Sequence, residues 1–207
     1  MLELGIYGGT YAPVHNGHIT AAEAFLAQAG LDKLLIMPTL IPPHKRLSYK
    51  DDPQDRLNML RLAFEDHVEY GKRIFISDYE INSPPPSYTV YTLRHFAEEN
   101  TRITFLCGTD MFLTLDKWKA PDEIFRLCRI ALMPREAEIS SELEEKLSAQ
   151  EEYYKKQFNA DIIRITAPAI EISSSEIRVG DGEFRKKYLP KAEIGRASCR
   201  ERVWTAV

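Results

Sequence analysis

Short apolar runs alternate along the chain with longer segments in which apolar residues recur at helical spacing. The apolar runs predict strands at Leu2–Tyr7, Lys33–Met37, Arg73–Ser77, Ile103–Cys107, Arg129–Met133 and Asp161–Thr166. The spaced segments predict helices over Ile19–Ala29, 52–64, Tyr88–Glu99, Pro121–Leu127 and Ser140–Gln157, and a further helix that starts at Ser173–Arg178. Because the strands are continuously apolar, we expect both faces of their sheet to be covered.

The order of the predicted elements indicates a fold class. Strands that alternate with helices imply βαβ units, and βαβ units pair their strands in parallel. We therefore predict an α/β fold, a doubly wound Rossmann-like parallel sheet with helices on both faces. Three helix ends carry capping signals: Gly30 after the first helix, Asp52 before Pro53, and a capping box from Ser173 to Glu176.

Composition narrows the class of protein. A length of 207 residues fits one compact domain. The 27 Lys and Arg against 31 Asp and Glu give a net charge of −4, so any polyphosphate ligand must meet a local basic site. The three cysteines form no CxxC pair, and no apolar run approaches the roughly 20 residues of a membrane span. We expect a cytoplasmic protein that neither enters a membrane nor binds a nucleic acid polymer.

The loop after the first strand, GGTYAPVHNGH, carries the strongest chemical signal. Gly8 and Gly9 allow a bulky anion to approach the backbone, and the helix that follows presents free N–H groups. His15 and His18 are three residues apart, so we expect them on one side of the first helical turn, where imidazoles can donate to phosphate oxygens. A plain glycine-rich turn with two surface histidines is the alternative.

This loop resembles the HxGH signature of the nucleotidylyltransferase superfamily, and its flanks resemble the bacterial nicotinate-nucleotide adenylyltransferases. That family joins nicotinate mononucleotide to ATP, releases pyrophosphate and uses Mg²⁺. The resemblance runs from Leu4 to about Pro190. It implies that Gly8, Gly9 and Thr10 bind substrate and that His15 and His18 act in catalysis. Further motifs carry it along the chain.

Two of these motifs concern phosphates. The resemblance implies that His44 and Lys45, in the PPHK segment, contact substrate phosphates, although a solvated surface loop is the plain reading. The segment ISSSEIR resembles the family's ISSTxIR motif. It implies that Ser174 and Ser175 bind the β- and γ-phosphates of ATP and that Arg178 neutralises the leaving pyrophosphate. Arg135 is a further nucleotide-contact candidate, and a solvated loop arginine is the alternative.

Other motifs concern the mononucleotide. By resemblance, Ser87, Tyr88 and Thr89 lie in the nicotinate pocket, although Ser87 could be a plain helix N-cap. In Gly108-Thr109-Asp110 the resemblance implies that Asp110 holds a ribose. Trp118 stands between two lysines, which favours an exposed stacking platform, and the family uses this Trp against the nicotinate ring.

The sequence departs from the family pattern in two places. Ala12 stands where the family has Asp or Asn before proline, which puts the bracing of the loop in question. Residues 193–207 lack the family's amphipathic last helix and resemble a translated sequencing adapter; a natural variant tail is the alternative. We expect a nucleotidylyltransferase domain over 1–192 with a truncated C-terminal helical part.

The mechanism predicted from these residues is adenylyl transfer with ATP and nicotinate mononucleotide as partners, without a protein metal site. We assign His15, His18, Lys45 and Arg178 to catalysis. Two alternatives stay open: another HxGH transferase, such as one resembling phosphopantetheine adenylyltransferase, and a non-catalytic nucleotide-binding module. The sequence leaves open whether the protein is a monomer or a homodimer.

Overall fold

The computed structural model describes residues 1–41, 52–134, 139–168 and 172–190 of the chain. Six strands form one sheet, in which every pair of neighbours is parallel and the order is β3-β2-β1-β4-β5-β6. The strands are β1 Leu2–Gly9, β2 Lys33–Pro38, β3 Ile74–Ile76, β4 Thr101–Cys107, β5 Cys128–Leu132 and β6 Ile162–Arg164. The chain starts in the middle of the sheet, builds one half outward and then crosses to the other half. The switch point lies between β1 and β4.

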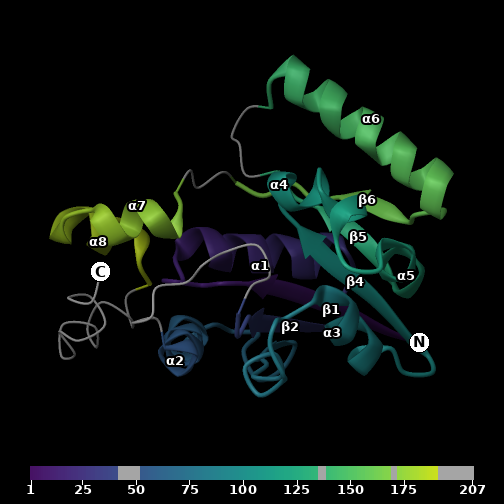
Figure 1. Cartoon of the computed structure of the whole chain (residues 1–207). Coiled ribbons are helices and arrows are strands. Elements are labelled where there is room, and N and C mark those ends of the chain that lie inside the picture. The colour runs from purple at the N-terminus through teal and green to yellow at the C-terminus, as the bar shows by residue number, and fades with distance from the viewer. Residues whose placement is uncertain (42–51, 135–138, 169–171, 191–207) are drawn as a thin grey trace.

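Helices lie on both sides of this sheet (Figure 1). They are α1 Asn16–Gln28, α2 Pro53–Phe64, α3 Thr89–Phe96, α4 Thr109–Phe112, α5 Pro121–Leu127, α6 Ser141–Phe158, α7 Ser174–Val179 and α8 Gly182–Tyr188, with a 3-10 turn at Leu115–Lys117. Helices α7 and α8 lie together at the left of Figure 1, beyond the first turn of α1. The predicted α/β class and parallel sheet are confirmed.

Alternate residues of the strands pack into two apolar cores, one on each face of the sheet. Leu35 and Met37 of β2 pack into a core that includes residues of α3, α5 and α6. Leu34 and Ile36 pack into a second core with residues of α1 and α2. Both faces of β2 therefore meet apolar residues, which explains why its sequence is a continuous apolar run and not an alternation.

The capping signals are confirmed. Gly30 has a φ of +64°, in the left-handed region that favours glycine after a helix. The Asp52 side chain accepts a hydrogen bond of 2.8 Å from the Gln54 amide. Ser173 and Glu176 form the reciprocal capping box.

Some boundaries differ from the prediction. Helix α1 begins at Asn16 and not at Ile19, because His15 is its N-cap. Helix α3 ends at Phe96 and not at Glu99, because Ala97 leaves the helical region with a ψ of 82°. Helices α4 and α8 were not predicted. Cys107 and Cys128 are buried and free, and burial raises the pKa of both thiols.

Two further predictions concern membrane spans and the domain boundary. Among the helices of the described residues, none has both the length and the apolar character that a membrane span requires. The doubtful tail, 193–207, lies outside the described residues, so the predicted domain boundary stays a prediction.

Candidate active site

The carboxyl ends of β1, β2 and β4 meet at one edge of the sheet. Gly8 and Gly9 pair in register with Met37 and Pro38 of β2, and the Gly9 carbonyl accepts from the Thr39 amide at 2.9 Å. Ligands of doubly wound sheets bind at this edge, beside the switch point. The described loops after β1 and β4, which carry two of the sequence motifs, therefore leave the sheet at the edge where this fold binds nucleotides.

The first loop is shaped around the buried ring of Tyr11. The Tyr11 backbone has a φ of +52°, and its hydroxyl donates to the Tyr7 carbonyl at 2.8 Å. A Cβ at Gly9 would lie only 2.9 Å from the Tyr11 ring, so the fold itself requires glycine there. A Cβ at Gly8 would meet the Phe105 ring at an ordinary 3.8 Å. The packing of the described residues therefore does not require glycine at position 8.

The rings of His15 and His18 lie against each other at the start of α1, with an angle of 35° between their planes. Their ring centroids are 3.7 Å apart, and the His15 residue is only 6% exposed. The His15 amide donates to Nδ1 of His18 at 3.1 Å. Because Nδ1 accepts, the proton of a neutral His18 ring is on Nε2, which makes Nε2 a hydrogen-bond donor. The predicted placement of both histidines on one side of the first turn is confirmed.

Helix α7 docks directly on the first loop. Ser174 Oγ donates to the Pro13 carbonyl at 2.8 Å, across 161 residues of sequence. Arg178 donates to the Ala12 carbonyl and, at 2.8 Å, to Ser175 Oγ. The loop is thus braced through its backbone at Ala12, where the family's Asp or Asn side chain is missing. Hydrogen bonds from Ser173, together with the nearby His15, lower the pKa of Glu176 at this junction.

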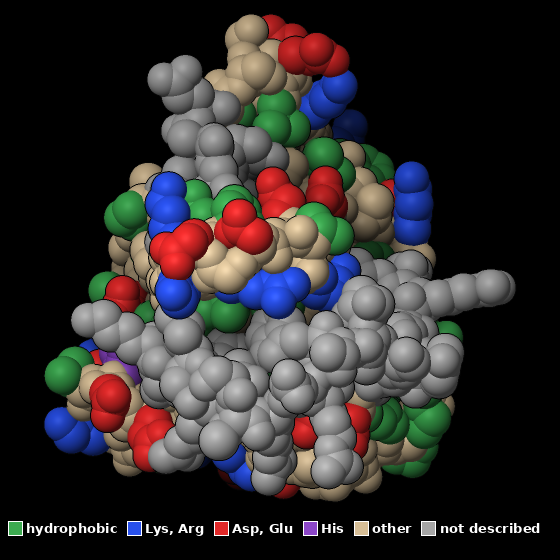
Figure 2. Space-filling view, turned by 90° about the vertical axis from the view of Figure 1, so that its left-hand side faces the viewer, with side chains coloured by type: hydrophobic (Ala, Val, Ile, Leu, Met, Phe, Trp, Pro, Cys, Tyr) green, Lys and Arg blue, Asp and Glu red, His purple; other side chains and the backbone are tan. Residues whose placement is uncertain are grey.

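Helix α8 supports α7 through an arginine that the sequence analysis missed. Arg185 donates to the Ile177 carbonyl at 3.2 Å and to the Arg178 carbonyl at 2.9 Å. The Asn16 side chain, in the first turn of α1, donates to the Lys187 carbonyl at 3.4 Å. Figure 2 shows Lys and Arg side chains gathered along one side of this helical end and acidic side chains along the other.

A second missed residue is Arg56 of α2. Its side chain is among the largest that are fully buried, and it donates to the Thr10 carbonyl at 2.9 Å and to the Leu40 carbonyl at 3.2 Å. One guanidinium therefore joins the loop after β1 to the loop after β2. The sequence gives only a weak indication that Arg56 is buried: it lies four residues before Leu60, on the buried face of its helix.

The segment Ser87–Thr89 is tied to the same second loop. Ser87 Oγ accepts from the Leu40 amide at 3.1 Å, and the Ser87 amide donates to the Ile41 carbonyl at 3.0 Å. Tyr88, not Ser87, is the N-cap residue of α3. The prediction of Ser87 as the N-cap is wrong, because α3 begins at Thr89 and Ser87 lies one residue before the N-cap position.

A buried carboxyl lies behind this segment and was also missed. Glu80 is 7% exposed, and the Thr92 hydroxyl donates to its Oε1 at 2.6 Å. Burial raises the pKa of Glu80 to about 7, against the opposite effect of hydrogen bonds from Thr92 and Ser87. A lone Glu in a loop of mixed polarity gave no sequence signal for this.

Trp118 and Asp110 lie beyond the end of β4. Asp110 is exposed in the first turn of α4, and Gly108 is the N-cap of that helix. The Trp118 ring is half-buried, edge-on to Phe105 at 6.3 Å, and its indole N–H donates to Thr114 at 3.4 Å. It is therefore not the freely exposed platform that its two lysine neighbours suggested.

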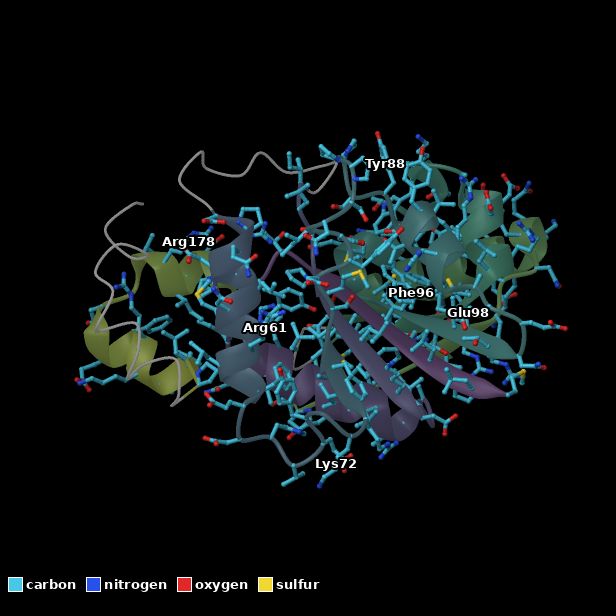
Figure 3. All side chains as sticks on the ribbon, turned by 90° about the horizontal axis from the view of Figure 1, so that it is seen from below. Arg61, Lys72, Tyr88, Phe96, Glu98 and Arg178 are labelled. Atoms are coloured by element: carbon cyan, nitrogen blue, oxygen red, sulfur yellow. The ribbon has the colours of Figure 1, made fainter. Side chains whose placement is uncertain are left out.

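The predicted site residues fall into two groups. One group lies around the first loop, and its members are Gly8, Gly9, Thr10, His15, His18, Ser174, Ser175 and Arg178. The other lies around the start of α3 and the end of β4, and its members are Ser87, Tyr88, Thr89, Gly108, Asp110 and Trp118. Arg178 and Tyr88 represent the two groups in Figure 3 and lie well apart there. Three predicted residues, His44, Lys45 and Arg135, lie outside the described residues.

Comparison with known proteins agrees with this architecture. The sequence model of the Cytidylyltransferase-like family matches residues 6–180. A Clostridium kluyveri protein named as a probable nicotinate-nucleotide adenylyltransferase is 34% identical over 196 residues, which cover 93% of this chain and 94% of that protein. The chain belongs to the nicotinate-nucleotide adenylyltransferase family. A relative of the same name from Caldicellulosiruptor saccharolyticus is 33% identical over 86% of this chain and 85% of its own length.

Solved structures of the family share the fold. The Plasmodium falciparum nicotinic acid mononucleotide adenylyltransferase complexed with NaAD superposes with a TM-score of 0.72 at 18% identity and covers 96% of both chains. A structure of the same enzyme complexed with APC gives a TM-score of 0.69 at 17% identity, again over 96% of both chains.

Proposed function

We propose that this protein transfers the adenylyl group of ATP to nicotinate mononucleotide, forming nicotinate adenine dinucleotide and pyrophosphate in NAD biosynthesis. The observation that carries the proposal is the docking of α7 on the first loop. It brings Arg178, Ser174 and Ser175 to the loop that leads into the adjacent rings of His15 and His18. Cations and hydroxyls then surround one site at the edge where this fold binds nucleotides.

The chemistry needs positioning and charge stabilisation more than a base. The mononucleotide phosphate is already anionic, so its oxygen can attack the α-phosphorus of ATP in line while pyrophosphate leaves. His18 would donate through Nε2 to the phosphate that gains charge, and the His15 ring lies beside the His18 ring. Arg178 and the Ser174 and Ser175 hydroxyls would receive the pyrophosphate. Lys45 has a predicted role on the same phosphates.

The side chains around the first loop suit a metal that arrives with its nucleotide. Within the described part of the chain, no group of three His, Cys, Asp or Glu residues is arranged to hold a metal ion. Mg²⁺ prefers phosphate oxygens and keeps few protein ligands at such sites. It would reduce the charge of the ATP phosphates, and the chain's own cations would meet the charge that remains.

We call the first loop with α7 the phosphate end, and Ser87–Thr89 with Trp118 and Lys119 the pyridine end. At the pyridine end, the free N–H groups at the start of α3 suit the nicotinate carboxylate. The half-buried Trp118 would pack against the ring. Asp110 would accept hydrogen bonds from ribose hydroxyls. We further propose a cytoplasmic location for this reaction.

An acceptor panel tests the proposal. The protein would be incubated with ATP, Mg²⁺ and one acceptor at a time: nicotinate mononucleotide, nicotinamide mononucleotide or phosphopantetheine. Pyrophosphate and the dinucleotide would both be quantified. We expect both products with nicotinate mononucleotide. Pyrophosphate release with phosphopantetheine alone would indicate a different HxGH transferase, and ATP binding without turnover would indicate a non-catalytic module.

A further inference from the structure

A single ammonium group lies over two aromatic rings at the start of α3. Lys119 Nζ is 4.5 Å from the centroid of the Tyr88 ring and 4.8 Å from that of the Tyr91 ring. It also donates to the Tyr91 hydroxyl at 2.6 Å. Cation–π attraction and this hydrogen bond hold a long, exposed side chain in one place. Such an arrangement fixes where the positive charge lies.

The ion pairs between described residues involve cations other than Lys119. Glu123, four residues further along the chain, is paired with Arg94, whose Nε donates to Glu123 Oε1 at 2.8 Å. Among residues 1–41, 52–134, 139–168 and 172–190, no carboxylate forms an ion pair with Lys119. Of its three N–H donors, the Tyr91 hydroxyl accepts one.

The position of Lys119 places that charge at the pyridine end. Lys119 follows Trp118 directly in sequence, and its ammonium covers the ring of Tyr88 from the Ser87–Thr89 segment. It therefore spans the two segments between which the proposed function puts the nicotinate ring. The two pyridine mononucleotides have almost the same shape there, but one carries a carboxylate and the other a neutral carboxamide. A fixed cation can separate them by charge alone.

We propose that the Lys119 side chain determines specificity: its ammonium, held by Tyr88 and Tyr91, favours the carboxylate of nicotinate mononucleotide over the carboxamide of nicotinamide mononucleotide. This inference rests on the proposed function and adds a residue that the sequence motifs do not contain. It assigns the preference for the acid to a side-chain charge, in addition to the backbone N–H groups of α3.

The test compares Lys119→Met with Lys119→Arg and with Lys117→Met. Lys117 is exposed on the other side of Trp118 and serves as the matched control. Each protein would be assayed with both mononucleotides. For Lys119→Met we expect KM for nicotinate mononucleotide to rise about tenfold, with kcat and the constants for the amide unchanged. Lys119→Arg should keep most of the preference, and Lys117→Met all of it.

The dependence of KM on salt concentration is a second measurement, and a purely structural role of Lys119 would not change it. In the wild-type protein, KM for the acid should rise with ionic strength, whereas in Lys119→Met it should be almost flat. Equal losses with both mononucleotides, or no loss with either, would overturn the inference while leaving the proposed function intact. A wild-type protein that uses neither mononucleotide would instead refute the proposed function and this inference together.

Discussion

The phosphate end and the pyridine end of the site are held in place by different kinds of contact. At the phosphate end, side chains donate to backbone carbonyls: Ser174 to Pro13, and Arg178 to Ala12. At the pyridine end, rings and charges dominate, with Lys119 over Tyr88 and a carboxyl group behind the segment. The first kind of contact depends little on the side chains of the loop that it fixes, whereas the second depends on every side chain involved.

This difference explains how the loop keeps its shape with alanine at position 12. Because Arg178 binds the carbonyl of Ala12, the brace is available to any residue at that position. The phosphate end can then keep one arrangement of donors for the chemistry. The pyridine end can change its substrate preference through single side chains. The variants below test whether the two ends are separable in this way.

The largest effect should follow from His18→Ala at the phosphate end. It removes a donor to the transferring phosphate, and we expect turnover to fall about 100- to 1,000-fold. The fold should remain, because the His18 side chain is only partly buried. Steady-state kinetics and thermal denaturation would check both points.

His67→Ala is the matched control, since His67 pairs with Glu23 at 2.9 Å away from the motifs. It should leave turnover near the wild-type value. If His18→Ala retained a near-normal rate, the assignment of the phosphate end would be wrong.

The phosphate end was more predictable from the sequence than the pyridine end. His15, His18, Ser174 and Arg178 belong to short motifs in which the neighbours along the chain already imply a helix start. Arg56 was not predictable, because its partners are carbonyls of two distant loops and carry no side-chain signal. Those contacts exist only once β1 and β2 are adjacent.

The same reasoning applies to the fold. The six strands were predicted because each is a short segment rich in apolar residues, such as Ile103–Cys107 and Lys33–Met37. Helix α4, at Thr109–Phe112, is too short to show any helical spacing. The prediction of Ser87 as an N-cap was wrong by one residue, because a local pattern cannot reveal that the Ser87 hydroxyl bonds to the distant Leu40 amide while α3 begins at Thr89. Glu80 was missed for a similar reason, because burial is a property of the packed molecule.

The next largest effect should come from Glu80→Gln at the pyridine end. The pKa of Glu80 is raised from 4.5 to about 7, so the folded state holds a proton that the unfolded state releases earlier. Wild-type stability should therefore fall as pH rises from 4.5 through 7. The glutamine variant lacks this loss. Above pH 7 its free energy of unfolding should therefore exceed that of the wild type by up to about 3 kcal/mol.

Urea unfolding between pH 4.5 and pH 8 would measure the effect. Glu98→Gln is the control, because Glu98 is exposed in the loop after α3, where Figure 3 labels it. It should follow the wild-type profile. Parallel pH profiles for wild type and Glu80→Gln would contradict the buried-carboxyl account of this end.

A glycine pair separates folding from ligand approach at the phosphate end. Gly9→Ala would push a Cβ to 2.9 Å from the buried Tyr11 ring, and we expect a loss of about 1–3 kcal/mol in unfolding free energy. Gly8→Ala meets only an ordinary contact of 3.8 Å, so thermal stability should be unchanged. Its ATP affinity should nevertheless drop, because the new methyl group occupies the ligand's approach. Calorimetric ATP titration of Gly8→Ala would detect this, and unchanged affinity would show that no phosphate comes close to Gly8.

The smallest effects should come from one serine at each end, and they test the separation most directly. Ser174→Ala loses the bond to the Pro13 carbonyl, and Ser87→Ala loses the acceptor for the Leu40 amide. Each is worth about 1 kcal/mol, which is roughly a fivefold change in a binding constant. If the ends are separable, Ser174→Ala should raise KM for ATP alone, and Ser87→Ala should raise KM for the mononucleotide alone.

Arg56 joins the two loops that carry these contacts, so the double variant of Ser174→Ala and Ser87→Ala shows whether the two ends are coupled. If the changes in KM add in the double variant, the two ends are independent. If instead each single variant raises both KM values by a similar factor, Arg56 couples the ends into one unit.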